Sequence, residues 1–511
     1  MDYIEYKDAK LQFVGIRKHF FRDKQYYVTV FQEYFTIGSS KDTQSPKYKI
    51  QLKLSTKINW NLKKLKDGVI LQSFVFPYQN KFKTLCADPL DLLRFKEILN
   101  LKVTYEGIGD TYIPLLQIGK GSSAKVYSAQ NVINSKVYAI KAIEKSFLNQ
   151  TDKGSGLEAY NMEVSILKII SGYSSNFLIL REIYEGDHTY YLVTEYLEGQ
   201  SLSEEIDRAK GLHDKRLPIQ NIKVIIAKLL QSVALLHSHK IIHRDLKPDN
   251  MMFAKRNDYF TLVLVDFGLA TIETLDKYSI ITITSRYLFP KCGTPGYVAP
   301  EVLTTSVSSK YTTKVDVFSC GCILYKLLTG RSIFNGNSFD EVLRANKKCE
   351  IDLKLPMDQH YITEDSIVIN QSYFNENLLN QLLRKDPKLR TSARKALQHP
   401  FFDQISEYST SLQASLLSTI KQNNLNFQIQ CEEIMSQYNL DEEVINSEIL
   451  DQELHQIQLP KLKKCNQMCE LQSPQNAMFQ FFQKEPLSIA RSNRLVDLAS
   501  PRGDFFEGIL E

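Results

Sequence analysis

Hydrophobic and polar positions along the first hundred residues follow the two-residue period of β-strands. β-Branched and aromatic residues alternate or cluster in short segments, and turn-forming residues separate these segments. Alternation of this kind is typical of strands that bury one face. We therefore expect strands or hairpins over residues 25–38, 47–60 and 68–85.

The period changes to that of a helix over residues 88–101. Asp88 suits the N-cap position, and Pro89 suits the first turn, where its missing amide hydrogen is not needed. Several antiparallel strands closed by one helix predict a small β-barrel domain over residues 1–105. The apolar face of the helix consists of Leu92, Phe95, Ile98 and Leu99.

The rest of the chain divides into two parts. Residues 112–402 place strands first and helices later, which predicts an α+β fold. Residues 403–511 are rich in Gln, Asn, Ser and Glu, so we expect this tail to be largely disordered. Its segments 411–422 and 441–458 carry enough apolar residues for short helices.

Composition narrows the class of protein. No apolar run approaches the roughly 18–20 residues of a membrane span, and the N-terminus lacks the apolar core of a signal peptide. The eight cysteines include no CxxC pair, which disfavours a disulfide framework and a zinc ribbon. We therefore expect a soluble, cytoplasmic protein whose thiols are reduced.

Charge is distributed unevenly along the chain. Residues 1–110 carry 19 Lys/Arg and 12 Asp/Glu, whereas residues 403–511 carry 8 and 16. The two ends therefore have different partners, or both are merely solvated faces. We predict no nucleic-acid partner, and the oligomeric state stays open.

A glycine-rich segment, 117–129, is the first candidate for phosphate binding. Gly119 and Gly121 allow a tight hairpin whose amides can approach phosphate oxygens, and Val126 would lie against a base. By itself this segment indicates only a glycine-rich turn, because Ala124 stands where a third glycine is usual.

Lys141 strengthens the phosphate interpretation. It lies within the apolar segment 137–141, where an unpaired ammonium would be costly, so it requires anions. Glu163, in the helical segment 161–170, is the expected carboxylate partner. The alternative for Glu163 is an exposed position on a surface helix.

Two further segments, HRDLKPDN (243–250) and LVLVDFGLA (262–270), complete a set of motifs. In order and spacing, residues 112–402 resemble the eukaryotic protein kinase family. The resemblance implies a bilobal fold, with a small β-rich N-lobe and a large helical C-lobe. It also implies transfer of the γ-phosphate of ATP to protein hydroxyls with Mg2+.

The resemblance also assigns roles to residues. Asp245 would accept the proton of the substrate hydroxyl, and Lys247 would steady the transferred group. Asn250 and Asp266 would hold Mg2+, and Lys141 would pair with Glu163. The expected nucleotide contacts are Ile118, Gly119, Lys120, Gly121, Val126, Ala139, Lys141, Glu195, Leu197 and Met252, with Thr194 as gatekeeper.

Structural roles follow from the same likeness. Asp316 would fix the backbone of the catalytic loop, and Glu301 would form a buried bridge with Arg390. Phe318 stands where tryptophan is usual. A stacked apolar spine would consist of His243, Phe267, Leu167 and Leu180.

At the positions of Lys247 and Thr294 the sequence resembles the serine/threonine-specific kinases. The motifs as a whole are most similar to those of the calcium/calmodulin-kinase-like group. Basic-directed members of that group carry acids where this chain has Lys326 and Ser201, so we expect no arginine-directed consensus. The alternative to an active kinase is a nucleotide-binding pseudokinase scaffold. A degenerate scaffold normally lacks at least one charged group that this chain retains.

The segment from Asp266 to Glu301 is longer than usual for the family. We predict an activating phosphorylation at Thr284 or Ser285, opposite Arg244. The alternative is a mobile loop whose hydroxyls are incidental.

The layout of residues 1–105 resembles a pleckstrin-homology (PH) domain. The segment 15–28 places four cations where phosphoinositide-binding members carry theirs, which implies recruitment to a membrane. A merely solvated basic loop is the alternative. The cations are Arg17, Lys18, Arg22 and Lys24.

Overall fold

The computed structural model describes most of the chain before residue 403, and the described residues belong to one compact unit. The expected disordered tail and its helices at 411–422 and 441–458 lie outside the described residues. The described ranges are 4–121, 124–150, 155–172, 175–211, 217–272, 292–304, 312–351, 353 and 378–402.

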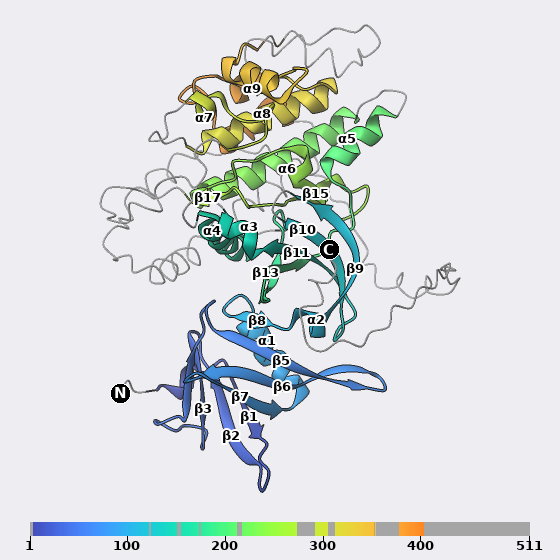
Figure 1. The fold of residues 1–511 in the computed structure, drawn as a ribbon. Helices are drawn as coiled ribbons and strands as arrows, with labels where there is room; N and C mark the ends of the chain where they lie inside the picture. Colours follow the sequence, from blue (N-terminus) through green and yellow to red (C-terminus); the bar gives the residue numbers. More distant parts are fainter. Residues whose placement is uncertain are drawn as a thin grey trace, which may run out of the picture. The chain divides into compact units, whose positions relative to one another are not determined.

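Seven antiparallel strands make up most of the N-terminal region, residues 4–106 (Figure 1). β1 pairs with β2 and β7, so the first and last strands of the series meet. The expected strands and the hairpin over 68–85 are confirmed. The strands are β1 (Leu11–Arg17), β2 (Lys24–Val30), β3 (Tyr34–Gly38), β4 (Tyr48–Gln51), β5 (Lys57–Leu65), β6 (Gly68–Tyr78) and β7 (Lys81–Ala87).

Helix α1 (Pro89–Leu99) packs against these strands and confirms the predicted helix. Asp88 caps it, because its side chain accepts hydrogen bonds from the backbone amides of Leu90 and Asp91. The ring of Phe95 is fully buried. Its aromatic neighbours are Phe13, Phe35, Trp60 and Phe74.

Two short elements after α1 were not expected from the sequence. β8 (Thr104–Glu106) pairs in parallel with β5, and α2 (Ile108–Thr111) precedes the next strand. A three-residue strand is too short to show a two-residue period, because its partners alone determine its conformation. Through β8, strands of the N-terminal region join one continuous sheet with those that follow.

Five further strands and two helices come next along the chain (Figure 1). The order β12-β13-β11-β10-β9 places β9 at the edge and β13 between β11 and β12. The elements are β9 (Tyr112–Lys120), β10 (Ala124–Asn131), β11 (Val137–Glu144), α3 (Lys145–Gln150), α4 (Ser155–Ile170), β12 (Leu180–Glu185) and β13 (Thr189–Glu195).

The part after β13 is mainly helical, so the predicted α+β class is confirmed. Its long helices gather into one group in Figure 1. The helices are α5 (Leu202–Lys210), α6 (Ile219–Ser238), α7 (Pro300–Thr304), α8 (Lys314–Thr329), α9 (Phe339–Lys348), α11 (Leu378–Leu382) and α12 (Ala393–Ala396). Short strands β14 (Ile241–Ile242), β15 (Met251–Phe253), β16 (Leu262–Leu264) and β17 (Thr271–Ile272) form two small sheets.

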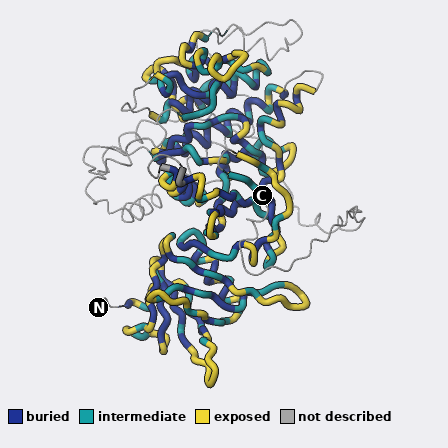
Figure 2. The backbone as a smooth tube through the Cα atoms, in the orientation of Figure 1, coloured by how far each residue is buried: buried dark blue, intermediate teal, exposed yellow. Residues whose placement is uncertain are grey.

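Helix α6 is the central core helix of this part. It packs against α8 and α12, and its residues are mostly buried (Figure 2). Contrary to our expectation from the sequence, α6 has the length and apolar composition of a membrane span. However, 72% of its most apolar stretch is buried inside the protein, which is the pattern of a core helix.

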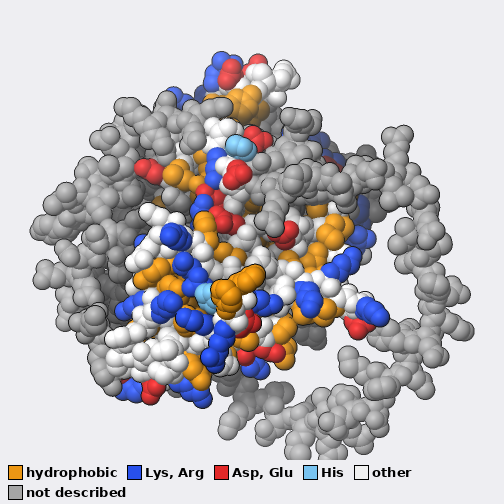
Figure 3. All heavy atoms as spheres, turned by 60° about the horizontal axis from the view of Figure 1, so that its bottom comes forward, with side chains coloured by type: hydrophobic (Ala, Val, Ile, Leu, Met, Phe, Trp, Pro, Cys, Tyr) orange, Lys and Arg blue, Asp and Glu red, His pale blue; other side chains and the backbone are white. Residues whose placement is uncertain are grey.

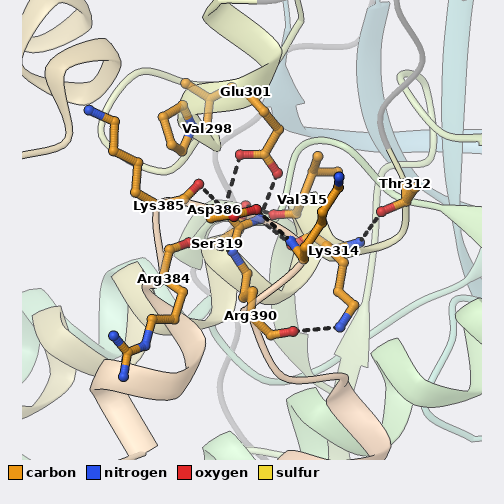
Figure 4. A network of polar contacts seen from close by, with 12 residues as sticks. Val298, Glu301, Thr312, Lys314, Val315, Ser319, Arg384, Lys385, Asp386 and Arg390 are labelled. Atoms are coloured by element: carbon orange, nitrogen blue, oxygen red, sulfur yellow. Dashed lines mark hydrogen bonds and ion pairs between the residues drawn. The ribbon is translucent and has the colours of Figure 1, made fainter.

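A buried ion pair joins α7 to the segment before α12 (Figure 4). Arg390 donates two hydrogen bonds to the carboxylate of Glu301, at 2.6 and 3.0 Å, so the predicted bridge is confirmed. Its guanidinium also donates to carbonyls of Lys314, Arg384 and Lys385, and it lies 4.9 Å from the ring of Phe318. Every part of this buried cation therefore has a partner.

We predict that Glu301→Ala lowers the free energy of unfolding by about 3–5 kcal/mol, because it leaves Arg390 buried without a counter-ion. The measurement is urea denaturation of the full chain. The matched control is Glu350→Ala, which removes the exposed pair with Lys348 and should cost less than about 1 kcal/mol. Equal losses in the two variants would contradict a structural role for the buried bridge.

Candidate active site

Lys141, Glu163 and Asp266 meet in one ion cluster. The ammonium of Lys141 on β11 lies 2.6 Å from Oε1 of Glu163 on α4 and 3.1 Å from Oδ1 of Asp266, which follows β16. Glu163 is buried and Asp266 is exposed. The expected pairing of Lys141 with Glu163 is confirmed, and the surface-helix alternative for Glu163 is wrong.

The cluster holds its three charges by mutual attraction. Burial opposes the charged form of Lys141, but the carboxylates of Asp266 and Glu163 outweigh it and raise its pKa. The Lys141 ammonium lowers the pKa of Asp266 to about 2. Burial raises the pKa of Glu163, and Lys141 opposes that shift. Asp266 is therefore a carboxylate at any physiological pH.

Close backbone packing surrounds the same cluster. Gly268 donates its amide to Asp266 Oδ1 at 3.3 Å. A Cβ at Gly268 would lie 3.3 Å from that oxygen and 3.6 Å from Glu163 Oε2, so a side chain here would crowd the cluster. Asp266 itself has a φ of +58°, a left-handed conformation that aspartate tolerates better than most residues.

A second polar cluster surrounds Asp245. Its Oδ1 accepts a hydrogen bond from the hydroxyl of Thr294 at 2.6 Å, and its Oδ2 lies 2.9 Å from the ammonium of Lys247. Lys247 also donates to Thr294 Oγ1 at 2.9 Å. Asn250 donates its side-chain amide to both the backbone and the carboxylate of Asp245. The structure thus brings together Asp245, Lys247 and Asn250, as the sequence predicts.

The two clusters are linked through the backbone. The carbonyl of Asn250 accepts the amide of Val265, the residue before Asp266, at 3.0 Å. Because Asn250 uses its side-chain nitrogen toward Asp245, its side-chain oxygen is the atom left for a cation. Asn250 and Asp266 therefore supply amide and carboxylate oxygens, the donors that Mg2+ prefers.

Asp316 on α8 holds the loop that carries Asp245. Its carboxylate accepts the backbone amides of His243 and Arg244, each at 2.9 Å, which confirms the predicted role. A third bond comes from Nε2 of His237 at 2.9 Å. Burial opposes the charge of Asp316, but these hydrogen bonds lower its pKa below the usual value. The loop is therefore anchored by a fully buried carboxylate.

Asn346 on α9 plays a similar part for the segment that carries Thr294. It is fully buried, and its side chain accepts the amide of Gly296 and donates to the carbonyl of Val298, each at 2.6 Å. Sequence reasoning did not select Asn346 or His237. Neither has a motif of its own, because each is needed only by a partner that is distant in sequence.

The glycine-rich hairpin forms as predicted. β9 and β10 pair with Gly119 opposite Val126, and Val126 faces Lys141 across β10 and β11. Gly121 donates its amide to the carbonyl of Ala124 at 2.8 Å, which closes the turn. The side chains of Ile118, Lys120 and Val126 are partly exposed, as expected for residues that border a binding surface.

The segment after β13 supplies the other predicted nucleotide contacts. Thr194 lies opposite Ala139, and its hydroxyl donates to the Ala139 carbonyl at 3.3 Å. The amide of Glu195 is already donated to the carbonyl of Ile179, and its carbonyl accepts the Thr194 hydroxyl at 3.3 Å, which leaves one lone pair of that carbonyl for a ligand. Leu197 is buried, and Met252 lies on β15.

The predicted spine residues are all buried. The rings of His243 and Phe267 lie with centroids 4.9 Å apart and are tilted by 48°, and both residues are fully buried with Leu167 and Leu180 nearly so. Thr284 and Ser285, the proposed phosphorylation sites, lie outside the described residues. Arg244, the expected cation, is buried and donates Nε to the carbonyl of Leu269.

Comparison with known proteins places this geometry in a family. A model of the protein kinase domain matches residues 112–402. A probable serine/threonine-protein kinase 2 of Plasmodium falciparum is 31% identical over 298 residues, 58% of this chain and 51% of the relative. Serine/threonine-protein kinase cds1 of Schizosaccharomyces pombe is 33% identical over 295 residues, 57% of this chain and 58% of the relative.

A third relative is serine/threonine-protein kinase DCLK3 of Mus musculus, which is 31% identical over 296 residues, 57% of this chain and 33% of the relative. The chain spans about half the length of the first two relatives. The family match covers more than half of the chain and includes every charged residue of both clusters. The chain therefore belongs to the protein kinase family.

Proposed function

We propose that this protein is a serine/threonine kinase that transfers the γ-phosphate of ATP to protein hydroxyls. The single observation that carries this proposal is the ion cluster in which Lys141 contacts both Glu163 and Asp266. The cluster draws one cation and one exposed carboxylate to the same place. Phosphoryl transfer needs such alignment and charge neutralisation more than covalent chemistry.

Lys141 would bind phosphate oxygens of ATP, because its ammonium is only partly buried and is held in place by Glu163. The hairpin of Gly119 and Gly121 would cover those phosphates with backbone amides. The adenine would lie between Val126 and Met252, where the Glu195 carbonyl would accept a hydrogen bond from it and the backbone of Leu197 would form another. Ile118, Lys120 and Ala139 complete the proposed pocket.

Asp245 would orient the hydroxyl of the substrate and accept its proton. The hydrogen bond that its Oδ1 accepts from the hydroxyl of Thr294 supports this role. The ammonium of Lys247, which lies 2.9 Å from Asp245 Oδ2, would neutralise charge on the transferred group. Asn250 and Asp266 would hold Mg2+, which when bound neutralises the phosphate oxygens and orients them.

The alternative is a pseudokinase scaffold that binds nucleotide without transfer. We favour transfer, because Lys141, Glu163, Asp245, Asn250 and Asp266 are all present and their contacts are satisfied. A scaffold that had lost catalysis would not be required to keep Asp245 in contact with Lys247.

We predict that Asp245→Asn lowers phosphorylation of a generic protein substrate at least about 100-fold while ATP binding persists. Asp266→Ala should lower both, because it removes a carboxylate from the proposed Mg2+ site. A radiolabelled phosphate assay and a nucleotide-binding titration measure the two effects. The control is Asp67→Asn, on an exposed turn. Full activity of Asp245→Asn would contradict the assignment.

We also propose that the enzyme does not prefer arginine upstream of its target hydroxyl. Lys326 on α8 donates to the hydroxyl of Tyr297 at 3.0 Å, in the segment that also carries Thr294. Lys210, and more weakly Lys326, lower the pKa of Asp207. A lysine in this neighbourhood would repel a basic peptide and attract an acidic one.

On a peptide array we expect glutamate to be preferred over arginine at positions upstream of the phosphorylated residue. Lys326→Glu should raise the relative kcat/KM for arginine peptides about tenfold, because it reverses one charge in the cleft. Lys255→Glu, an equal charge change at an exposed position, is the control. A preference for arginine in the unaltered protein would contradict the proposal.

We further propose that residues 1–105 form a PH-like domain that recruits this cytoplasmic protein to anionic membranes. The seven strands and the closing helix support the likeness. Arg17 at the end of β1 pairs with Lys24 at the start of β2, and the loop between them exposes Phe20 and Phe21 by 96% and 95%. Two bare aromatic rings beside cations are typical of a membrane-contacting surface.

Further cations lie at the same end of the strands. Lys47 donates to the hydroxyl of Tyr26 at 3.2 Å, and Arg17 donates to Tyr48 at 3.3 Å. The hydrogen bond to Tyr26 raises the pKa of Lys47. Figure 3 shows this side of the molecule, where Lys and Arg side chains surround hydrophobic ones. Together they offer several donors to phosphate groups of a lipid headgroup.

We predict that the triple change Lys18→Ala, Arg22→Ala and Lys24→Ala weakens binding to phosphoinositide-containing vesicles about 100-fold, because each cation adds about 1 kcal/mol near an anionic surface. Exchanging Phe20 and Phe21 for serine should cost at least about tenfold, with little dependence on salt.

Vesicle co-sedimentation of the full chain measures both effects, with phosphatidylcholine vesicles as the lipid control. The protein control is the pair Lys64→Ala and Lys66→Ala, near the turn between β5 and β6. Failure of the unaltered protein to bind phosphoinositide vesicles would remove the membrane proposal without touching the kinase proposal.

A further inference from the structure

The N-terminal region and the kinase domain share a strand. Tyr105 on β8 pairs with Ile58 on β5 and with Tyr184 on β12, so both edges of β8 are occupied. β5 belongs to the N-terminal region, and β12 lies within the kinase domain. Separating the two regions would therefore break pairing on one side of β8 and expose its backbone groups.

A buried ion pair crosses the same boundary. Lys96 on α1 donates to Oε1 of Glu182 on β12, and the two residues are 5% and 8% exposed. The other carboxylate oxygen of Glu182 accepts the hydroxyls of Tyr112 at 3.1 Å and Tyr184 at 2.9 Å. Glu182 therefore has its charge and both oxygens satisfied only while Lys96 is in place.

The surroundings of this pair are apolar and aromatic. The ring of Tyr184 lies 5.4 Å from that of Tyr105 and 6.0 Å from that of Tyr112, and all three residues are almost fully buried. A single hydrophobic core contains buried residues of both regions, with Phe13 as its first member along the chain and Val193 as its last. Interfaces between separable domains are usually more polar than this.

A second ionic contact lies beside the buried pair. Glu185 on β12 lies 3.2 Å from the ammonium of Lys57 on β5 and 2.8 Å from that of Lys145 on α3. Burial opposes the charge of Glu185, but the two lysines outweigh it and lower its pKa. Two residues of β12, Glu182 and Glu185, thus each contact a lysine of the N-terminal region.

The residue just before β12 is hydrogen-bonded to Glu195, a member of the proposed nucleotide pocket. Ile179, just before β12, accepts the backbone amide of Glu195 and donates its own amide to the Glu195 carboxylate, each at 3.1 Å. Glu195 is the residue whose carbonyl we assign to adenine. A displacement of β12 would therefore move the strand end that positions Glu195.

We propose that residues 4–106 are a permanently docked part of the kinase domain, and that Lys96 is a positioning residue that holds β12 through Glu182. The two regions then unfold together, and a ligand in the ATP pocket stabilises both. The nucleotide part rests on the proposed function, whereas the joint unfolding does not.

Trp60 makes the joint unfolding of the two regions directly measurable. It is the only tryptophan of the chain, and it is 2% exposed in the core of the N-terminal region. Most helical residues that the structure describes lie beyond residue 106. Urea unfolding of the full chain, followed by tryptophan fluorescence and by far-UV circular dichroism, therefore reports on the two regions separately.

We expect the fluorescence and dichroism midpoints to coincide, and Mg-ATP to raise both equally. Permanent docking would be overturned by two separate midpoints, or by a fluorescence midpoint that does not change when Mg-ATP is bound. If Mg-ATP binds nowhere on the chain, the proposed function fails, but coincidence of the midpoints without nucleotide still decides the docking.

Variants test the role of Lys96. In thermal unfolding followed by the same two signals, Lys96→Met should lower both midpoints by about 5–10 °C, because Glu182 is left buried without its cation. The double change Lys96→Met with Glu182→Met should recover part of that loss, since no charge is then uncompensated. Lys66→Met, at an exposed position, is the control and should change neither midpoint.

A kinetic readout separates positioning from stability alone. Well below the unfolding midpoint, Lys96→Met should raise the KM for ATP at least about threefold and leave kcat within about twofold, because the adenine contact is lost from ground state and transition state alike. An unchanged KM would overturn the positioning role. If Lys96→Met does not fold, the double variant provides the same comparison.

Discussion

Lys141 brings an ammonium group into a β-sheet where it is stable only between two carboxylates. Its partners, Glu163 and Asp266, come from a helix and from a loop 125 residues further along the chain than Lys141. An ammonium left there without them would carry a large desolvation penalty. The pairing therefore constrains β11, α4 and the segment after β16 to one arrangement. It is also the arrangement that the proposed chemistry needs.

The same constraint recurs at other junctions of the fold. Asp316 anchors the loop before Asp245, and Arg390 joins two helical segments through Glu301. Asp316 and Arg390 are buried and fully hydrogen-bonded, so each tolerates little displacement. Catalysis by alignment benefits from this, because a group misplaced by about 1 Å loses much of its effect. The buried ionic contacts thus supply the rigidity on which the exposed Asp266 relies.

Lys96 and Glu182 extend this pattern beyond the kinase domain. They make the N-terminal region part of the structure around β12 rather than a separate attachment. The residues of the membrane proposal, Phe20 and Phe21 with their flanking cations, form a different set. Membrane contact and docking can therefore operate at the same time. A kinase held in this way would be carried to a membrane as one body with its N-terminal region.

Local sequence determined the elements whose signals are local. The alternation over 25–38 and the cap at Asp88 depend on neighbours a few residues away, and the strands and the helix formed as predicted. The pairing of Lys141 with Glu163 was also predictable, because an ammonium in an apolar strand requires an anion and the next helical segment offers Glu163. The family resemblance, and not the residue spacing, identified Asp245, Asn250 and Asp266 as one group.

Only the tertiary structure decided the contacts that lack a local signal. β8 is three residues long, and Lys96 lies in a helix whose pattern gives its charge no partner. Asn346 and His237 are polar residues whose use depends on groups brought near by folding. A buried polar group must find a partner, but its own sequence neighbourhood does not say which one. The physical reason is that burial is a property of the packed chain, whereas periodicity and capping belong to its separate segments.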